Sequence, residues 1–366
     1  MRDPVQPQAF LDSWQSLLAA AQPGLIAAAR LLLIDSSRPP WHASGLRLAA
    51  GDEVSWFAHG ESVLTPLPTI RVGPALQIWA RLGAADIFRG VGDSHTFRAD
   101  GPGELELGTY FPGEWRSPGG DLAVPPDTYG TVQGCFGVVV LHWAAGVAPV
   151  DGMQRLLALG NPAQSLSRAI ARLRHPVAPP PGWSYLWAPG PAEIYRAQPA
   201  DGPCIDCHTR ADVGILRHAA PYALTPGTTL DWEWRMEQLP SAVAEDTLPT
   251  HDYLSIAVEF DNGRDLSYFW SAELPVGKHF HCPIPTWAAR ETHLVVRSGN
   301  AGFGEWQHER RDLHADYRRC IGEPPARIER VWLIAVSLFQ QQEGRCSYRR
   351  IALDGSGSRL AVGSGS

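Results

Sequence analysis

One stretch of the chain constrains the fold more than any other. From His251 to Trp270, two runs of alternating strand-favouring residues flank the dipeptide Asn262-Gly263. An Asn-Gly pair between two such runs is a strong signal for a β-hairpin, because glycine adopts the positive φ that a tight turn requires. We therefore expect antiparallel strands here.

The composition agrees with a mostly β protein. Of 366 residues, 36 are Gly and 32 are Pro, and only 19% are charged. This composition indicates short strands joined by turns, since a helical bundle would carry more Glu and Lys on its surface. The length exceeds that of one small core, so we expect two domains.

Charge and hydropathy narrow the classes of partner. A formal charge of -7 with no basic run argues against binding to nucleic acid. The apolar runs are shorter than the roughly 20 residues that cross a bilayer, and the start of the chain lacks the pattern of a signal peptide. The six cysteines are mostly scattered. We therefore expect a soluble, cytoplasmic protein with reduced thiols.

Periodicity and composition divide the chain into five segments. Both larger segments are expected to be β-sandwiches of the jelly-roll or galactose-binding-like kind, accompanied by a few short helices. The expected segments are an N-terminal helical segment (1–44), a β-sandwich (45–150), a helix with a Pro-rich linker (151–181), a second β-sandwich of seven or more strands (182–354) and a flexible tail (355–366).

The C-terminal sandwich, from about residue 183 to 353, resembles the bacterial DUF3047 family, whose function is unknown. The resemblance implies a fold but no activity. The sequence departs from the expected pattern at Gln340–Gly344, where an acidic, Thr-rich loop is expected. The matching segments are Trp232–Arg235, Glu245-Asp246 leading to His251-Asp-Tyr253, Leu266–Trp270, Val296–Gly299 and Trp306 through Glu309–Asp312 to Asp316-Tyr317.

The N-terminal sandwich resembles, more weakly, the galactose-binding lectin-like fold, through residues 99–108 and 127–140. In those lectins a calcium ion bridges protein and sugar through Asn and Asp oxygens. Here Thr131-Val132 stands where two Asn are expected, which leaves Asp127, Thr128 and Gln133. Calcium prefers six to eight oxygen ligands, so this resemblance implies the fold without the sugar site.

Cysteine and histidine offer candidate metal ligands. Cys204-Ile-Asp-Cys207-His208 has the spacing of a haem attachment or half a zinc site, but on a strand its two cysteines point to opposite faces and cannot share one metal. We expect no haem. Several histidines in the second domain, beside Asp252, Glu309 and Asp316, would suit a divalent metal such as zinc, iron or manganese. They are His251, His279, His281, His293, His308 and His314.

Acid–base chemistry is a further candidate. Asp252 or His293 would act as the base, Arg297 would neutralise developing charge, and Glu245-Asp246 would supply further carboxylates. Alternation along residues 293–297 predicts that His293 and Arg297 project from one polar face of a sheet. The opposing interpretation is that Asp252 only begins a strand.

Aromatic residues suggest a surface for a ligand. Alternation along residues 230–237 places Trp232 and Trp234 in the core. Trp270 and Trp287 remain as a platform on which a sugar ring could stack, with His251 and Tyr268 beside it.

Three hypotheses follow for the function. The first is a carbohydrate-associated protein that binds a glycan or small polar ligand on the polar sheet face of the second domain. The second is a lyase or hydrolase that uses the same face by acid–base or metal chemistry. The third is a structural role. No Gly-x-Ser-x-Gly elbow, dinucleotide fingerprint or P-loop occurs, so we expect no nucleotide cofactor.

Overall fold

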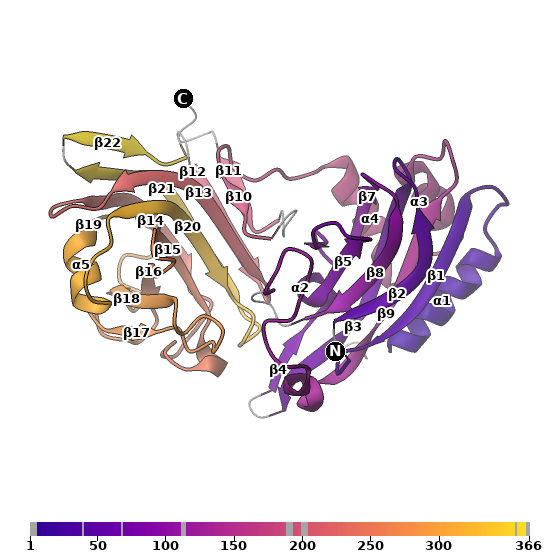
Figure 1. Cartoon of the computed structure of the whole chain (residues 1–366), viewed down its shortest axis with the longest axis horizontal. Helices are drawn as coiled ribbons and strands as arrows, with labels where there is room; N and C mark the ends of the chain where they lie inside the picture. Colours follow the sequence, from indigo (N-terminus) through magenta and orange to yellow (C-terminus); the bar gives the residue numbers. More distant parts are fainter. Residues whose placement is uncertain are drawn as a thin grey trace. The chain divides into compact units, whose positions relative to one another are not determined.

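The computed structural model describes residues 6–38, 40–66, 69–110, 115–187, 193–198, 204–355 and 357–363. It divides the chain into two compact units, 1–177 with 189–191 and 178–188 with 192–366. Both units are built mainly of antiparallel sheets (Figure 1), which confirms the predicted fold class. Within the described residues, no helix has the length and apolar character needed to cross a membrane.

The first unit has two sheets and a layer of helices. A five-stranded sheet in the order β1-β9-β3-β4, with β7 on β3, faces a four-stranded sheet in the order β2-β8-β5-β6. The strands are β1 (Ile26–Asp35), β2 (Trp41–Leu48), β3 (Glu53–Pro66), β4 (Thr69–Val72), β5 (Ile78–Leu82), β6 (Phe88–Arg89), β7 (Ser94–Arg98), β8 (Gly103–Thr109) and β9 (Gln133–Trp143).

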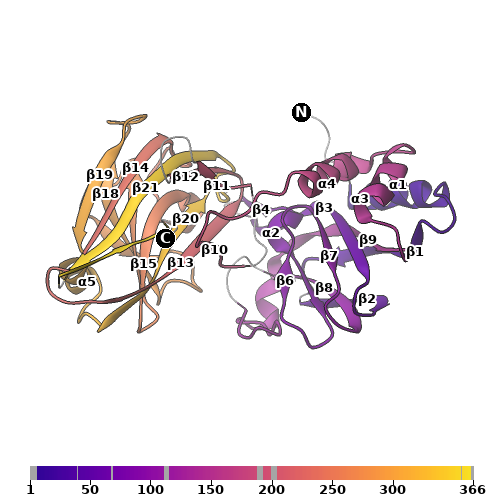
Figure 2. The same cartoon turned by 90° about the horizontal axis from the view of Figure 1, so that it is seen from above.

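Three helices cover the outer side of the five-stranded sheet, as Figure 2 shows. They are α1 (Pro7–Ala19), α3 (Pro149–Leu157) and α4 (Ser165–Arg174). Trp14, Met153 and Ile170 pack with Leu141 of β9 in one apolar cluster. Short helical turns complete this unit: α2 (Pro74–Gln77), η1 (Pro126–Thr131) and η2 (Pro162–Gln164).

This arrangement corrects one predicted segment. The N-terminal segment 1–44 is helical only over α1, because the branched, apolar run of β1 pairs with β9 instead. Tertiary pairing here outweighs local composition. Segment 151–181 is helical in its first part, as predicted, but with two helices, α3 and α4, which bury Leu156 and Leu166 against the first sheet.

The second unit is a β-sandwich of two sheets. One has seven strands in the order β10-β13-β20-β15-β16-β18-β17, and the other has six, in the order β11-β12-β21-β14-β19 with β22 on β21. The strands are β10 (Ser184–Tyr185), β11 (Tyr195–Gln198), β12 (Cys204–Arg210), β13 (Val213–Ala223), β14 (Thr229–Gln238), β15 (Tyr253–Phe260), β16 (Asp265–Ser271), β17 (His279–His281), β18 (Glu291–Ser298), β19 (Gln307–Asp312), β20 (Arg327–Val336), β21 (Glu343–Gly355) and β22 (Ser358–Ala361).

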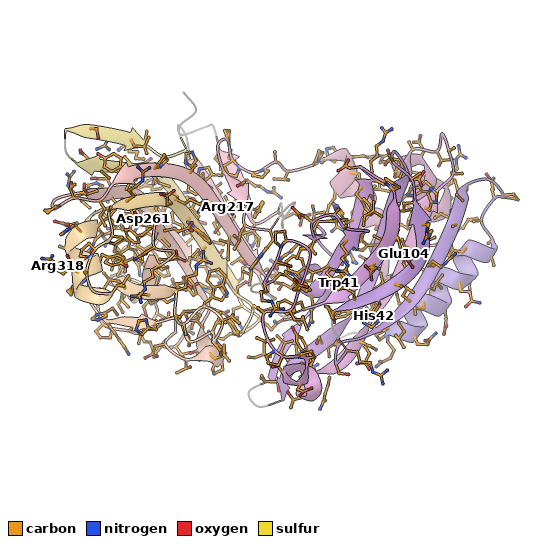
Figure 3. The ribbon with its side chains drawn as sticks, viewed as in Figure 1. Trp41, His42, Glu104, Arg217, Asp261 and Arg318 are labelled. Carbon is orange, nitrogen blue, oxygen red and sulfur yellow. The ribbon has the colours of Figure 1, made fainter. Side chains whose placement is uncertain are left out.

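Alternation along the strands builds the core between these sheets. Leu254, Ile256 and Val258 of β15 point inward, as do Trp232 and Trp234 of β14. Side chains fill the space between the sheets (Figure 3). The two tryptophans are therefore core residues, as the sequence predicts.

The hairpin that the sequence predicts is present as β15 and β16. Gly263 has a φ of +75°, and the pairing runs from Ser255 opposite Phe269 to Glu259 opposite Asp265. The turn lies against helix α5 (Leu313–Cys320), where Asn262 donates to the hydroxyl of Tyr317 at 2.7 Å. Asp261 and Arg318 mark this end of the unit in Figure 3.

One further expectation needs correction. The tail 355–366 is not wholly irregular, since β22 pairs with β21. Helix α5 begins directly after β19, and Asp312 caps it by accepting the N–H of Ala315.

Candidate functional site

The seven-stranded sheet carries polar residues on the face turned away from the sandwich core. This face is buried, and β17 extends the sheet beyond β18, with the buried Cys282 and Trp287 following it in the chain. The buried polar side chains on or beside it include His251, Ser255, Asp265, Ser267, Glu291 and His293.

Three of the side chains at this face converge. The ligand atoms of His251, Cys282 and His293 all lie within 4.8 Å of one another, and they form the one group of this kind among the described residues. His251 Nε2 lies 3.5 Å from Cys282 Sγ. Two imidazoles and a thiol are a donor set that suits zinc.

The loop before β15 fixes His251. Its Nδ1 lies 2.7 Å from the backbone carbonyl of Glu245, so Nδ1 carries the proton and Nε2 presents a lone pair. The carboxylate of Glu245 in turn accepts the N–H of Ala272 at 2.6 Å. Burial, followed by the nearby His293, lowers the pKa of His251 to about 3 and keeps the ring neutral.

The ring of His293 is held by aromatic packing. It stacks on Phe280, with centroids 5.2 Å apart, and meets the edges of Tyr253 and Phe269. Nε2 lies 3.5 Å from Glu291 Oε1, yet neither ring nitrogen makes a hydrogen bond within the part of the chain that the structure describes.

Cys282 and Glu291 complete the cluster. Burial first, and then the Glu291 charge, raises the pKa of the Cys282 thiol. Burial would also raise the pKa of Glu291, but the electrostatic effect of the nearby His293 lowers it overall. Tyr253 donates to Glu291 Oε1 at 3.3 Å. Cys282 and Glu291 were not among the predicted site residues, although Glu291 and His293 share a strand face by simple alternation.

The predicted catalytic residues do not form one site. Asp252 is buried and accepts the backbone N–H groups of Phe339 at 2.9 Å and Gln340 at 2.7 Å, so it anchors the loop after β20. Burial raises its pKa to about 6. Asp246 pairs with Lys278 at 2.6 Å.

The predicted face shared by His293 and Arg297 is wrong. A register shift between β16 and β18 follows Val295, and Arg297 lies opposite Trp270. Its guanidinium lies over the ring of Trp270, 5.3 Å from the centroid, and pairs with Glu309 of the other sheet. A bulge breaks the alternation on which the prediction rested.

The predicted aromatic platform lies inside the protein. Tyr268 and Trp270 belong to the sandwich core, where Tyr268 donates to Asp316 at 3.2 Å. Trp287 is also buried, and the guanidinium of Arg290 lies 4.9 Å from its ring centroid. As the structure stands, these rings present no exposed surface to a ligand.

The remaining predicted metal ligands lie apart from the cluster. His279 and His281 share a face of β17, as predicted, but both are exposed, and only Phe280 between them points toward His293. His308 is exposed and lies 3.6 Å from Asp231. Cys207 packs in the core while Cys204 lies outside it, which agrees with the prediction that they cannot share a metal.

The outer face of the six-stranded sheet differs, because its charged side chains are partly exposed, although Ser347 between them is buried. Ser347 of β21 lies between Asp206 of β12 and Arg235 of β14, and Arg349 lies opposite Glu233. Ser347 donates to Asp206 at 2.8 Å, and Arg349 donates to Glu233 at 2.6 Å. The sequence carries this signal as alternation in residues 231–237.

One half-buried indole lies over these rows. The guanidinium carbons of Arg349 and Arg235 lie 3.9 and 5.1 Å from the ring centroid of Trp306. The side chains of Arg235 and Arg349 are 31% and 21% exposed. We call Asp206, Glu233, Arg235, Trp306, Ser347 and Arg349 the exposed polar face.

Comparison with known proteins agrees with this architecture. The fold and its buried and exposed polar faces define the C-terminal unit as a β-sandwich domain. Its residues 182–352 match the family described as "Protein of unknown function (DUF3047)", which confirms the predicted resemblance. No curated protein matches the chain.

Solved structures also resemble parts of this chain, with low identities and TM-scores. The N-terminal domain of EclA, a PllA-like lectin, is 18% identical and covers 33% of this chain and 99% of its own, with a TM-score of 0.26. The xyloglucanase domain of NopAA from Sinorhizobium fredii is 10% identical over 49% of this chain and 92% of its own, with a TM-score of 0.26. A truncated AlyQ with CBM32 and alginate lyase domains is 9% identical and covers 90% of this chain and 97% of its own, with a TM-score of 0.23. The likeness extends to the fold alone.

In the first unit, Asp127 and Thr128, two of the three residues that the lectin resemblance brings into question, lie exposed on η1. Asp127 belongs to no group of three His, Cys, Asp or Glu ligands among the described residues.

Proposed function

We propose that the C-terminal domain binds a carbohydrate, and that the ligand lies on the exposed polar face of the six-stranded sheet. The observation that carries this proposal is the position of Trp306, whose indole lies beside two guanidiniums above rows of paired donors and acceptors. The binding surface is therefore on the opposite sheet from the one that the sequence suggested.

The chemistry of the exposed polar face suits a hydroxyl-rich ligand. Each sugar hydroxyl both donates and accepts a hydrogen bond, so it can pair with a carboxylate and a guanidinium that lie side by side. Arg349 and Glu233 form such a pair at 2.6 Å, and Ser347 with Asp206 forms another at 2.8 Å. An indole offers an apolar surface to the C–H groups of a pyranose ring.

Arg235 has hydrogen-bonding capacity to spare. Its Nε has no hydrogen-bond partner in the described structure, while its Nη2 reaches Ser347 only at 3.5 Å. A buried N–H without a partner is costly, so a bound hydroxyl would be favourable at this atom.

The alternative of acid–base catalysis at Asp252 has less support. Both of its carboxylate oxygens already accept backbone N–H groups, and the side chain is buried. A general base must lie within hydrogen-bond reach of a substrate proton. Asp252 therefore fits a structural role better than a catalytic one.

The test is a screen of the whole chain against a panel of soluble polysaccharides by affinity electrophoresis, with isothermal titration of any that bind. We expect Trp306→Ala to lower the affinity about tenfold, which corresponds to the roughly 1.4 kcal/mol that an aromatic contact contributes. His279→Gln, an exposed change on the other sheet, should bind normally. Equal affinity of Trp306→Ala and the unmodified protein, or no binding to any polysaccharide, would overturn the proposal.

A further inference from the structure

We propose that the C-terminal domain binds one zinc ion through His251, Cys282 and His293, and that the ion is structural. The proposal does not depend on carbohydrate binding, since the cluster lies on the buried face of the seven-stranded sheet.

The spacing of the donor atoms fits a tetrahedral ion. Zinc lies about 2.0–2.1 Å from an imidazole nitrogen and about 2.3 Å from a thiolate sulfur, so tetrahedral angles place the two ligand atoms about 3.6 Å apart. His251 Nε2 and Cys282 Sγ are 3.5 Å apart. His293 lies within 4.8 Å of both, so a small adjustment of the rings would bring all three to one ion.

The buried imidazole of His293 is the second line of support. Neither of its nitrogens makes a hydrogen bond among the described residues, and the nearest acceptor, Glu291 Oε1, lies 3.5 Å from Nε2. Buried polar groups in folded proteins almost always have a partner, because leaving one unmade is costly. A metal ion at this place would supply the partner that the protein does not.

Groups around the cluster already orient the ligands. The Glu245 carbonyl accepts the proton of His251 Nδ1, which directs Nε2 toward Cys282. The backbone N–H of Ile284 donates to the sulfur. Such outer hydrogen bonds are typical of metal sites, where they fix the tautomer and the direction of each ligand.

The position of the cluster indicates what the ion would do. His251 ends the loop before β15, Cys282 follows β17, and His293 belongs to β18. All three side chains are buried, so the ion would lie out of reach of a substrate. The ion would therefore fasten the segment that follows β17 and the loop before β15 to β18.

The first measurement is the zinc content of the full-length protein, by inductively coupled plasma mass spectrometry after dialysis. We expect about one zinc per chain, retained after brief treatment with a weak chelator and lost after a strong one. Protein stripped of metal should take up one Co²⁺ and develop a thiolate-to-cobalt charge-transfer band, which reports the sulfur ligand directly.

Variants locate the ion. Cys282→Ser should lose the charge-transfer band and most of the zinc, whereas His281→Gln, an exposed histidine one residue away, should keep both. If Cys282→Ser does not fold, the protection of Cys282 against alkylation in the unmodified protein, with and without zinc, answers the same question. No uptake of zinc or cobalt by the stripped, folded protein would overturn the proposal, as would a cobalt band in Cys282→Ser equal to that of the unmodified protein.

Discussion

The two outer faces of the C-terminal sandwich carry similar polar residues, but one face is partly exposed and the other is buried. On the six-stranded sheet, Glu233 and Arg349, whose side chains are partly exposed, pair with each other. On the seven-stranded sheet, His293 and Glu291 are buried, and the nitrogens of His293 make no hydrogen bond among the described residues. The charged groups of the first face pair mostly with one another, whereas the buried imidazole of the second is left without a hydrogen bond.

This difference separates two kinds of binding. An exposed row of paired charges has little effect on folding and is free to meet a ligand from solution. A buried polar group without a partner destabilises the fold unless something inside the fold completes it. We therefore assign an external ligand to the exposed polar face and an internal one to the cluster around Cys282.

Removing zinc should produce the largest effect. A ligand that binds only the folded state stabilises it by about 4 kcal/mol at a concentration a thousandfold above its dissociation constant. We expect urea unfolding of the C-terminal domain, followed by circular dichroism, to shift to lower urea when the metal is stripped. The urea midpoint of the Trp306→Ala variant should shift by the same amount as that of the unmodified protein when zinc is removed. If the midpoint does not depend on zinc, the contrast between the two faces fails.

The titration of Asp252, which anchors the loop after β20, should have the second largest effect on the stability of the domain. Burial raises the pKa of Asp252 from 3.8 to about 6, although backbone N–H groups of Gln340 and Phe339 oppose the shift. The folded state therefore binds this proton more tightly than the unfolded chain does. The contribution of Asp252 to the free energy of unfolding should be fully present below about pH 4. It should be lost, by about 3 kcal/mol at most, as the pH rises through 6.

Asp252→Asn, which cannot titrate, is the matched control, and its denaturant midpoint should change less over the same pH range. The carboxylate on the other face should behave oppositely. Burial acts to raise the pKa of Glu233, but Arg349 and Arg350 lower it overall, so its contribution is present above its ordinary range and lost toward acid. A parallel pH profile for Asp252→Asn and the unmodified protein would show that Asp252 titrates normally.

Local sequence signals predict the strands better than they predict what covers them. The Asn262-Gly263 turn and the alternation in residues 230–237 gave the β15–β16 hairpin and the buried tryptophans, because both depend on neighbouring residues only. The burial of the outer face of the seven-stranded sheet depends on contacts that are distant in sequence, such as that of His251 with Cys282. His251 and Trp287 are both buried.

For the same reason, the sequence predicts only part of the metal-ligand cluster. His251 and His293 were among the predicted metal ligands, but Cys282 was taken for an isolated thiol, since only the fold brings it within 3.5 Å of His251. Arg297 was placed on the wrong face because of a register shift that alternation does not reveal. The exposed polar face was missed because Trp306 lies outside the strands whose residues it covers.

The smallest effect should come from an ion pair on the exposed polar face. Glu233 accepts hydrogen bonds from Arg349 at 2.6 Å and Arg350 at 2.7 Å, but the Arg350 side chain is 70% exposed. Glu233→Gln should lower the free energy of unfolding by only about 0.5–1 kcal/mol, and less at high salt. Chemical denaturation at low and high ionic strength measures it. A loss as large as that caused by removing zinc would mean that this face, too, is part of what holds the domain together, and the polar rows could no longer be regarded as free to meet a ligand.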